Sequence, residues 1–161
     1  MRIYVATHAE IPHMHRIRMS VRENRLSDQT RVRAHDYMAF VERDGRAWVA
    51  EVDGRIVGFA VADLARSNVW ALFVEPGYEG HGIGRQLHDR MMDWLFGSGA
   101  TLVWLRTDPD TRAERFYRAA GWRYVGQEEH GEARFEMAND QGGRARHPRD
   151  LEDGARGRAA V

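Results

Sequence analysis

The chain has 161 residues, enough for one domain with its own hydrophobic core. The 24 Lys and Arg residues balance the 24 Asp and Glu residues. No overall electrostatic field therefore favours nucleic acid or an acidic membrane surface as a partner. Every basic residue is arginine and there is no cysteine, which excludes lysine Schiff bases, disulfides, thiolate metal sites and cysteine nucleophiles.

Hydropathy along the chain is that of a protein that does not enter membranes. No apolar run approaches the roughly 18 residues of a membrane span, and the N-terminus lacks the apolar core of a signal peptide. We therefore expect a cytoplasmic protein. No internal repeat is present.

The first third of the chain predicts a strand followed by two helices. Residues 2–6 form the strand, and Pro12 suits the first turn of a helix that runs to about Glu23. After a polar stretch, a second helix places Tyr37, Met38 and Val41 near one face and ends at Asp44-Gly45.

A hairpin and a third strand come next. The dipeptide Asp53-Gly54 separates two strand-like runs at 47–52 and 55–64, and Asp-Gly between such runs is a strong hairpin signal. Asn68 opens a further strand, whose run Trp70–Val74 is apolar enough to be buried on both faces.

The stretch after this strand is the most informative in the chain. Pro76-Gly77 ends the strand, and glycines then stand at alternate positions in the run Gly80–Gly84. A helix follows, with one apolar face formed by Ile83, Leu87, Met91 and Leu95. The start of a helix presents unpaired N–H groups, and glycines let a ligand approach the backbone. The stretch therefore predicts an anion site, most plausibly for a phosphate.

Neither of the two best-known phosphate motifs fits this loop. A P-loop needs a lysine followed by Ser or Thr after its last glycine, and both are missing here. The dinucleotide pattern G-x-G-x-x-G also fails, because its last position falls on Arg85 or Leu87.

The last part of the chain with apolar periodicity predicts a strand, a helix and two further strands. Residues 101–106 form a strand predicted to lie parallel to the strand that begins at Asn68, across a helical crossover. A helix ending at Gly121 has the face Ala113, Phe116, Tyr117 and Ala120. Residues 122–125 and 132–137 then read as strands. From Asn139 to Val161 apolar periodicity vanishes, which predicts one domain over residues 1–138 and a disordered tail over 139–161.

Two of these stretches resemble motifs of the GCN5-related N-acetyltransferase (GNAT) superfamily. The run Glu79-Gly80-His81-Gly82-Ile83-Gly84 is similar to the acetyl-CoA motif [QR]-x-x-G-x-[GA], which follows a strand ending in V-x-P. The segment from Asp110 to Trp122 resembles the later element N-x-x-A-x-x-F-Y-x-x-x-G-[FW]. The resemblance covers roughly residues 1–137.

The resemblance implies the fold and the co-substrate. It implies an α/β (α+β) fold with a mixed, mostly antiparallel twisted sheet of about six or seven strands, about four helices, and central strands splayed to hold CoA. It implies acetyl-CoA as co-substrate and no metal. The residues expected to bind it are Leu72, Phe73, Val74, Glu79, Gly80, His81, Gly82, Ile83, Gly84, Arg85, Asp110 and Tyr117.

The implied reaction is direct attack of a primary amine on the thioester, through a tetrahedral intermediate. By the same resemblance, Tyr117 is the general acid for the leaving thiolate, and the N–H of Val74 is a candidate oxyanion donor. No motif fixes the general base. Glu23 is the preferred candidate, and the other candidates are Asp28, His35, Glu51, Asp63 and Glu128.

Two departures from the family pattern bear on the cofactor. Glu79 replaces the usual Gln or Arg beside the diphosphate, and Asp110 replaces Asn. A non-enzymatic acyl-CoA-binding or regulatory module on the same fold therefore stays open as the alternative function. The acceptor is expected to be a small-molecule or peptide amine. A homodimer stays open, whereas nucleic acid and membrane are not expected as partners.

Overall fold

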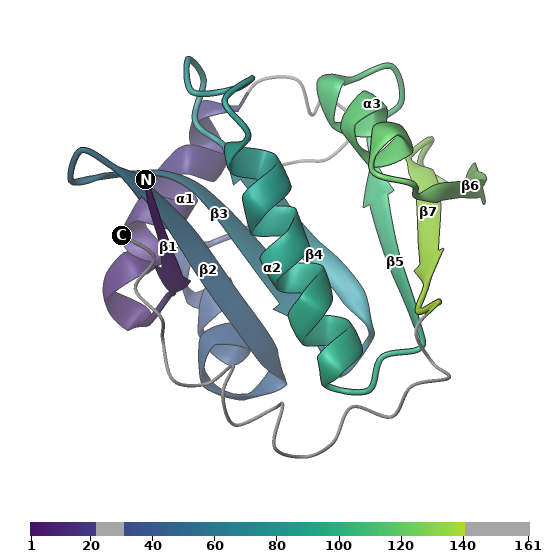
Figure 1. Cartoon of the computed structure of the whole chain (residues 1–161), viewed down its shortest axis with the longest axis horizontal. Coiled ribbons are helices and arrows are strands. Elements are labelled where there is room, and N and C mark those ends of the chain that lie inside the picture. Colours follow the sequence, from purple (N-terminus) through teal and green to yellow (C-terminus); the bar gives the residue numbers. More distant parts are fainter. Residues whose placement is uncertain (22–30, 141–161) are drawn as a thin grey trace.

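The centre of the molecule is one mixed sheet of seven strands, in the order β1-β2-β3-β4-β5-β7-β6 (Figure 1). The structure is a computed structural model and describes residues 1–21 and 31–140. All neighbouring strands are antiparallel except β4 and β5. The predicted mixed, mostly antiparallel sheet is thereby confirmed. The strands are β1 (Arg2–Val5), β2 (Gly45–Val52), β3 (Arg55–Asp63), β4 (Asn68–Val74), β5 (Leu102–Thr107), β6 (Arg123–Gln127) and β7 (Ala133–Ala138).

Helices cover both faces of this sheet (Figure 1). They are α1 (Ile11–Ser20), α2 (Ile83–Gly97) and α3 (Arg112–Ala119), with shorter turns at η1 (His8–Glu10), η3 (Ala34–Tyr37) and η4 (Phe40–Asp44). The strand β3 supplies both faces alternately: Phe59 belongs to the core under α1 and Ala60 to the core under α2. In the described ranges, no helix combines the length and apolar character needed to span a membrane.

The hairpin predicted at Asp53-Gly54 is confirmed. Asp53 (φ 49°) and Gly54 (φ 76°) are both left-handed, as a two-residue turn between twisted strands requires. The turn joins β2 and β3, which pair along their whole length.

The apolar face predicted for α2 is also confirmed. Ile83 is 4% exposed, and Leu87, Met91 and Leu95 are fully buried. Gly58 of β3 lies below them: a Cβ there would be 3.0 Å from Cγ2 of Ile83 and 3.1 Å from Cδ1 of Leu87. This glycine lets α2 pack close to the sheet, which sets the position of the helix start beside β4.

Two helix predictions in the first third were wrong in detail. The first helix ends at Ser20 rather than about Glu23, because Val21 is already extended (φ −84°, ψ 123°). The second expected helix ends at Asp44 as predicted, but it is irregular, with a 3₁₀ turn over Ala34–Tyr37 followed by a π-type turn over Phe40–Asp44. Tyr37 and Phe40 both pack against Trp70, so tertiary packing rather than helix propensity sets the path here.

The parallel strands β4 and β5 separate soon after they begin. Their register contains one pair, Asn68 with Trp104, and the Asn68 amide donates to the Trp104 carbonyl at 3.0 Å. A bulge follows in β4, since Ala62 pairs with Val69 while Val61 pairs with Ala71. Trp70 is the extra residue, and such bulges bend a strand and re-aim its side chains. The predicted splaying of the central strands is confirmed (Figure 1).

The boundary of the predicted tail lies at the edge of the described chain. The Asn139 N–H donates to the Thr101 carbonyl at 2.9 Å, so the described fold reaches Asn139. Residues 141–161 lie outside the described residues, and the division into a domain and a tail stays a prediction.

Candidate functional site

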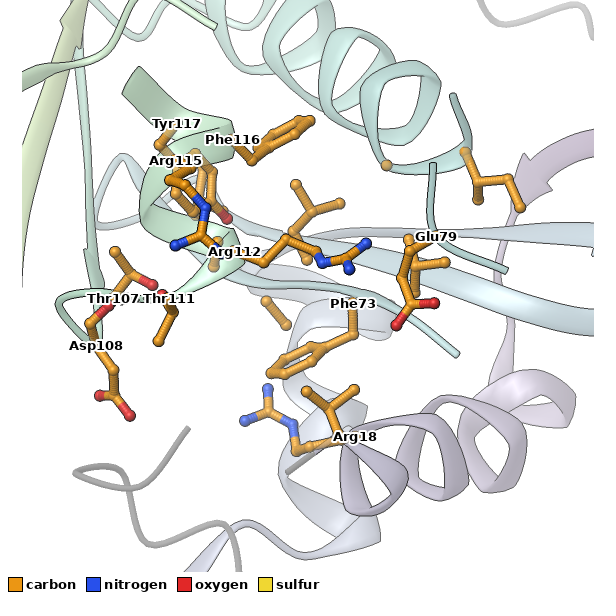
Figure 2. A pocket seen from close by; sticks show the side chains of 18 of the residues that line it. Arg18, Phe73, Glu79, Thr107, Asp108, Thr111, Arg112, Arg115, Phe116 and Tyr117 are labelled. Carbon is orange, nitrogen blue, oxygen red and sulfur yellow. Dashed lines mark hydrogen bonds between the residues drawn. The ribbon is translucent and has the colours of Figure 1, made fainter. Parts of the chain in front are cut away.

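The gap between β4 and β5 opens into a cleft of about 1360 Å³ (Figure 2). Four parts of the chain line it: β4, the loop between β4 and α2, the segment from β5 into α3, and the end of α1. This cleft contains every residue that the sequence analysis assigned to a cofactor except His81. His81 is exposed in the same loop, and its Nδ1 lies 3.2 Å from the Tyr78 carbonyl oxygen.

The glycine-rich loop is shaped by positive backbone angles. Gly80 (φ 77°) and Gly82 (φ 79°) are left-handed, and Gly82 is the N-cap of α2. Among the described residues, no side chain caps this helix start. Its first N–H groups therefore suit an anionic ligand. A Cβ on Gly84 would lie 3.6 Å from Val74, so the glycine also lets the helix start sit close to β4.

The charges around the cleft favour an anion. Its described lining contains five arginines and three carboxylates: Arg18, Arg85, Arg106, Arg112 and Arg115 against Glu79, Asp108 and Asp110. Figure 2 shows the guanidinium of Arg112 extending across the cleft toward Glu79. Arg85 is held by Asp89 at 3.1 Å on the next turn of α2.

The strand β4 offers its backbone to this cleft. Leu72, Phe73 and Val74 pair with β3 on one side, and β5 has already separated on the other. An open strand edge is a place where an extended ligand binds by main-chain hydrogen bonds. The structure thus brings the three predicted strand residues to the same cleft as the glycine loop.

Tyr117 lies on α3, at the wall of the cleft opposite β4 (Figure 2). It is 6% exposed, and its ring packs edge-on against Phe116 and Trp122, with centroids 5.4 and 5.7 Å apart. Burial raises the pKa of the Tyr117 hydroxyl well above its ordinary value. The hydroxyl keeps its proton at neutral pH, as an exposed tyrosine also does, and burial makes it a weaker acid.

A buried histidine that the sequence analysis overlooked joins α2 to α3. His88 is 4% exposed, and its Nε2 accepts a hydrogen bond from the Trp122 indole at 2.9 Å. Its Nδ1 lies 2.8 Å from the Asp89 carboxylate, so the neutral ring donates there. The ring also meets Phe116 edge-on at 5.6 Å. His88 thereby fixes the aromatic cluster that holds Tyr117.

We expect His88 to make the fold sensitive to mild acid. Burial lowers the pKa of His88, and the nearby Asp89 opposes that shift only in part. Because the folded pKa is below the unfolded value of about 6.5, the unfolded chain binds more protons as the pH falls, and stability drops below about pH 6.5. Urea midpoints measured at pH 7.5 and 5.5 should fall more for wild type than for His88→Gln. An equal fall in both proteins would contradict this role, and the exposed His130→Gln should behave like wild type.

The predicted general bases do not gather at the cleft. Glu23 and Asp28 lie outside the described residues, and their roles stay predictions. The other four are absent from the cleft lining and each has an oppositely charged or ionisable neighbour: His35 beside Asp36, Glu51 beside Arg2, Asp63 beside Arg66, and Glu128 beside Arg134.

The buried carboxylate that does line the cleft is Asp108, which the sequence analysis treated as a turn residue. It is 4% exposed and follows directly after β5. Its carbonyl accepts from the Thr111 hydroxyl at 2.8 Å, and Thr111 also caps α3. An acidic residue at the carboxyl end of a parallel strand is the signal that would have found it.

The two departures from the family motif have local explanations. The Glu79 carboxylate accepts from the Gly77 N–H at 2.7 Å and so orders its own loop. Asp110 is left-handed (φ 61°), a conformation that Asn and Asp adopt more readily than other side chains. Its N–H donates to Glu114 at 2.7 Å, which fixes the start of α3.

Sequence comparisons give a family and several partial relatives. The model of the acetyltransferase (GNAT) family matches residues 11–122. The N-alpha-acetyltransferase RimI of Mycobacterium tuberculosis is 36% identical over 83 residues, which cover 48% of this chain and 51% of that protein. The L-2,4-diaminobutyric acid acetyltransferase of Nocardia farcinica is 35% identical over 74 residues, covering 43% of this chain and 38% of that protein. The chain thus matches about half or less of the length of these relatives.

Solved structures share the fold at low identity. A ribosomal-protein-alanine N-acetyltransferase from Brucella melitensis has a TM-score of 0.69 at 20% identity, covering 86% of this chain and 100% of that chain. The PaiA N-acetyltransferase from Thermoplasma acidophilum, solved in complex with coenzyme A, has a TM-score of 0.68 at 13% identity, with coverage of 86% and 100%. These likenesses concern the arrangement of the sheet and helices.

Proposed function

The chain belongs to the acetyltransferase (GNAT) family, and on this premise we propose that it moves an acetyl group from acetyl-CoA to a primary amine by direct attack. One observation carries the proposal: the cleft between the splayed strands β4 and β5 joins the glycine loop, an open strand edge and the buried Tyr117. Those are the parts needed to hold a diphosphate, an extended arm and a leaving thiolate.

The co-substrate is proposed to lie along the cleft from the start of α2 to Tyr117. The N–H groups of the glycine loop, Gly80–Gly84, hold the diphosphate, and Arg85 adds positive charge beside it. The backbone of Leu72–Val74 holds the pantetheine arm as an added strand would be held. This places the thioester near Tyr117. No metal takes part in this proposal.

The reaction needs three things from the protein. The amine must lose a proton, because an alkylammonium has a reference pKa of about 10.4 and cannot attack. The amine nitrogen then forms a bond to the thioester carbon, and the N–H of Val74 stabilises the oxyanion. The C–S bond breaks as the intermediate collapses: the nitrogen releases its second proton to solvent, and Tyr117 donates its proton to the departing sulfur and regains one from solvent.

Two carboxylates are candidates to take the proton from the amine. Glu23 is the sequence-based candidate, and its place stays a prediction. Asp108 has the support of the structure, since it is buried and lines the cleft at the end of β5. The proposed acceptor is a small-molecule or peptide amine, and the proposed location is the cytoplasm.

The competing proposal is a non-enzymatic module that binds acyl-CoA and serves regulation. Glu79 beside the proposed diphosphate site favours it slightly, whereas the presence of Tyr117 in the cleft favours the enzyme. Turnover of acetyl-CoA with a panel of amines, followed by release of free thiol, separates the two. Thiol release that depends on the amine supports the enzyme, and tight binding without any release supports the module.

Glu79→Gln should tighten acetyl-CoA binding several-fold. The Glu79 carboxylate lines the cleft at the loop that is proposed to hold the diphosphate, so like charges repel there. A glutamine keeps an oxygen that can accept from the Gly77 N–H, so the loop stays ordered while the charge is removed. The gain should shrink as salt is added, because salt screens the repulsion.

Calorimetric titration of acetyl-CoA at two salt concentrations measures this effect. Glu129→Gln, an exposed change in the loop after β6, is the matched control and should leave the affinity unchanged. Weaker or equal binding of acetyl-CoA by Glu79→Gln would mean that the Glu79 carboxylate stabilises the loop more than it repels the diphosphate.

A further inference from the structure

A buried carboxylate follows directly after β4, next to the proposed oxyanion donor. Glu75 is 9% exposed and stands between Val74 and Pro76. Both of those neighbours line the cleft, whereas Glu75 does not. Glu75 occupies the variable position of the V-x-P pattern, so the family motif assigns it no role. Because a buried charge is costly unless it is paired, this carboxylate needs partners.

Two arginines from other parts of the chain hold Glu75. Arg55, at the start of β3, donates from Nε to Oε2 at 3.0 Å and from Nη2 to Oε1, the two-pronged geometry of a strong arginine–carboxylate pair. Arg16 of α1 donates from Nη1 to the same Oε1 and from Nη2 to the carbonyl of Ile56 at 2.8 Å. The hydrogen bonds from Arg55 and Arg16 hold the pKa of Glu75 below its ordinary value against the effect of burial, so the carboxylate is charged at neutral pH. We call Arg16, Arg55 and Glu75 the carboxylate clamp.

The carboxylate clamp ties three elements together at the end of β4. Arg16 comes from α1, Arg55 is the first residue of β3, and Glu75 follows the last residue of β4. In this region β4 pairs with β3 alone, because β5 has separated from it after Asn68. A strand end with few neighbours opens locally more easily than one packed on both sides. The clamp thus supplies, through side chains, support that a second paired strand would otherwise give.

The backbone of Glu75 fixes the direction of the neighbouring N–H. The Glu75 N–H donates to the Val57 carbonyl at 2.7 Å, so these two residues form a hydrogen-bonded pair of the antiparallel ladder. Such pairs alternate with pairs that exchange no hydrogen bond. Val74, opposite Gly58, belongs to the second kind and directs its N–H away from β3, toward the cleft that it lines. A shift of the end of β4 would therefore move this N–H relative to a bound thioester.

We propose that Glu75 is a positioning residue, and that the carboxylate clamp holds the end of β4 so that the Val74 N–H meets the oxyanion of the tetrahedral intermediate. The inference rests on the proposed function and adds to it residues that do not touch the substrates. A preorganised donor stabilises the charge that develops in the transition state more than it stabilises the bound thioester. Loosening the clamp should therefore lower kcat more than it raises KM for acetyl-CoA.

Glu75→Gln tests the inference by steady-state thiol release with a fixed amine. Glutamine keeps the size of the side chain and removes its charge and one acceptor oxygen. Loss of a whole oxyanion donor costs about 10²- to 10³-fold in kcat, so a donor that is present but poorly placed should cost about 10- to 100-fold. KM and Kd for acetyl-CoA should change little. A lower melting temperature with an unchanged kcat of the folded protein would show a purely structural role and overturn the inference.

A double-mutant cycle tests whether the three residues act as one unit. Arg16→Gln and Arg55→Gln should each lower kcat, and adding either to Glu75→Gln should cause little further loss. Glu75→Asp, which keeps the charge, should recover part of kcat. Losses that multiply in the double variants would overturn the clamp. If Glu75→Gln does not fold, the kcat and KM of Arg16→Gln decide alone.

Glu136→Gln is the matched control for the loss of a paired carboxylate. Glu136 also lies between two arginines, Arg123 and Arg134, but it belongs to β7 and is absent from the cleft lining. Its replacement should leave kcat at the wild-type value. A loss of kcat equal to that of Glu75→Gln would overturn the assignment, since the effect would then not depend on the end of β4.

Failure of the inference and failure of the proposed function give different results. Amine-dependent thiol release that Glu75→Gln leaves at the wild-type kcat overturns the inference alone. If wild type releases no thiol with any amine, the proposed function fails, and amide hydrogen exchange measured by NMR then decides whether the clamp orders the end of β4. With acetyl-CoA bound, the Glu75 N–H should exchange about tenfold faster in Arg16→Gln than in wild type, because its bond to Val57 opens more often. Equal exchange rates would overturn the clamp.

Discussion

Replacing Tyr117 by phenylalanine is expected to reduce acetyl transfer by about 10²- to 10⁴-fold, the usual contribution of a general acid. The change removes only the hydroxyl, so the ring contacts with Phe116 and Trp122 remain. Acetyl-CoA affinity and the melting temperature should therefore change little. Steady-state thiol release with a fixed amine measures the effect.

The raised pKa of Tyr117 limits how readily its hydroxyl gives up its proton. A thiol has a reference pKa of about 8.5, so full proton transfer from a buried phenol to a thiolate in water would be uphill. Burial of the thiolate in the cleft raises the pKa of the thiol and so narrows the difference between the two pKa values. In addition, a hydrogen bond from Tyr117 to the developing negative charge needs no complete proton transfer. Tyr124→Phe, an exposed tyrosine of β6, is the matched control. Wild-type turnover by Tyr117→Phe would show that Tyr117 is not the general acid.

Replacing Asp108 by asparagine is expected to lower kcat by about 10²- to 10⁴-fold at neutral pH, because an amide cannot take the proton from the amine. The side chain keeps its size, and the turn is held through the backbone carbonyl that Thr111 contacts. Raising the pH should recover part of the loss, since more of the amine is then neutral without a base. A pH profile of kcat for the variant measures this recovery.

Two further variants make the assignment of the base decisive. Glu51→Gln changes a candidate that the structure places away from the cleft, beside Arg2, and should leave turnover unchanged. Glu23→Gln tests the sequence-based candidate. A large loss in Glu23→Gln together with a small one in Asp108→Asn would transfer the role of base to Glu23.

Local signals predicted the elements that depend on local chemistry. Asp53-Gly54 specified its hairpin because both residues tolerate the left-handed backbone. The four-residue spacing from Ile83 predicted α2 because that face is buried along its length. The segment 34–44 is helical and ends at Asp44 as predicted, but packing of Tyr37 and Phe40 on Trp70 makes it irregular rather than a regular α-helix.

The residues of the candidate site fall into the same two groups, those that local sequence predicted and those that it did not. The glycine loop and Tyr117 belong to contiguous motifs, and the structure brings both to one cleft. Arg18, His88 and Asp108 belong to no motif, and Arg18 and His88 gain their environment from residues distant in sequence. Arg18 needs Trp70, and His88 needs Trp122. No residue spacing along the chain predicts such contacts.

The most direct test of the central claim follows an isotopically labelled acetyl group in a single turnover. The full chain is mixed with labelled acetyl-CoA, first alone and then with an amine, and the label is located after quenching. Direct attack predicts no label on the protein in either case, and with the amine an N-acetyl product in amounts equal to the free thiol. Acetyl-CoA that binds but gives no labelled product with any amine would contradict the claim and favour the non-enzymatic module.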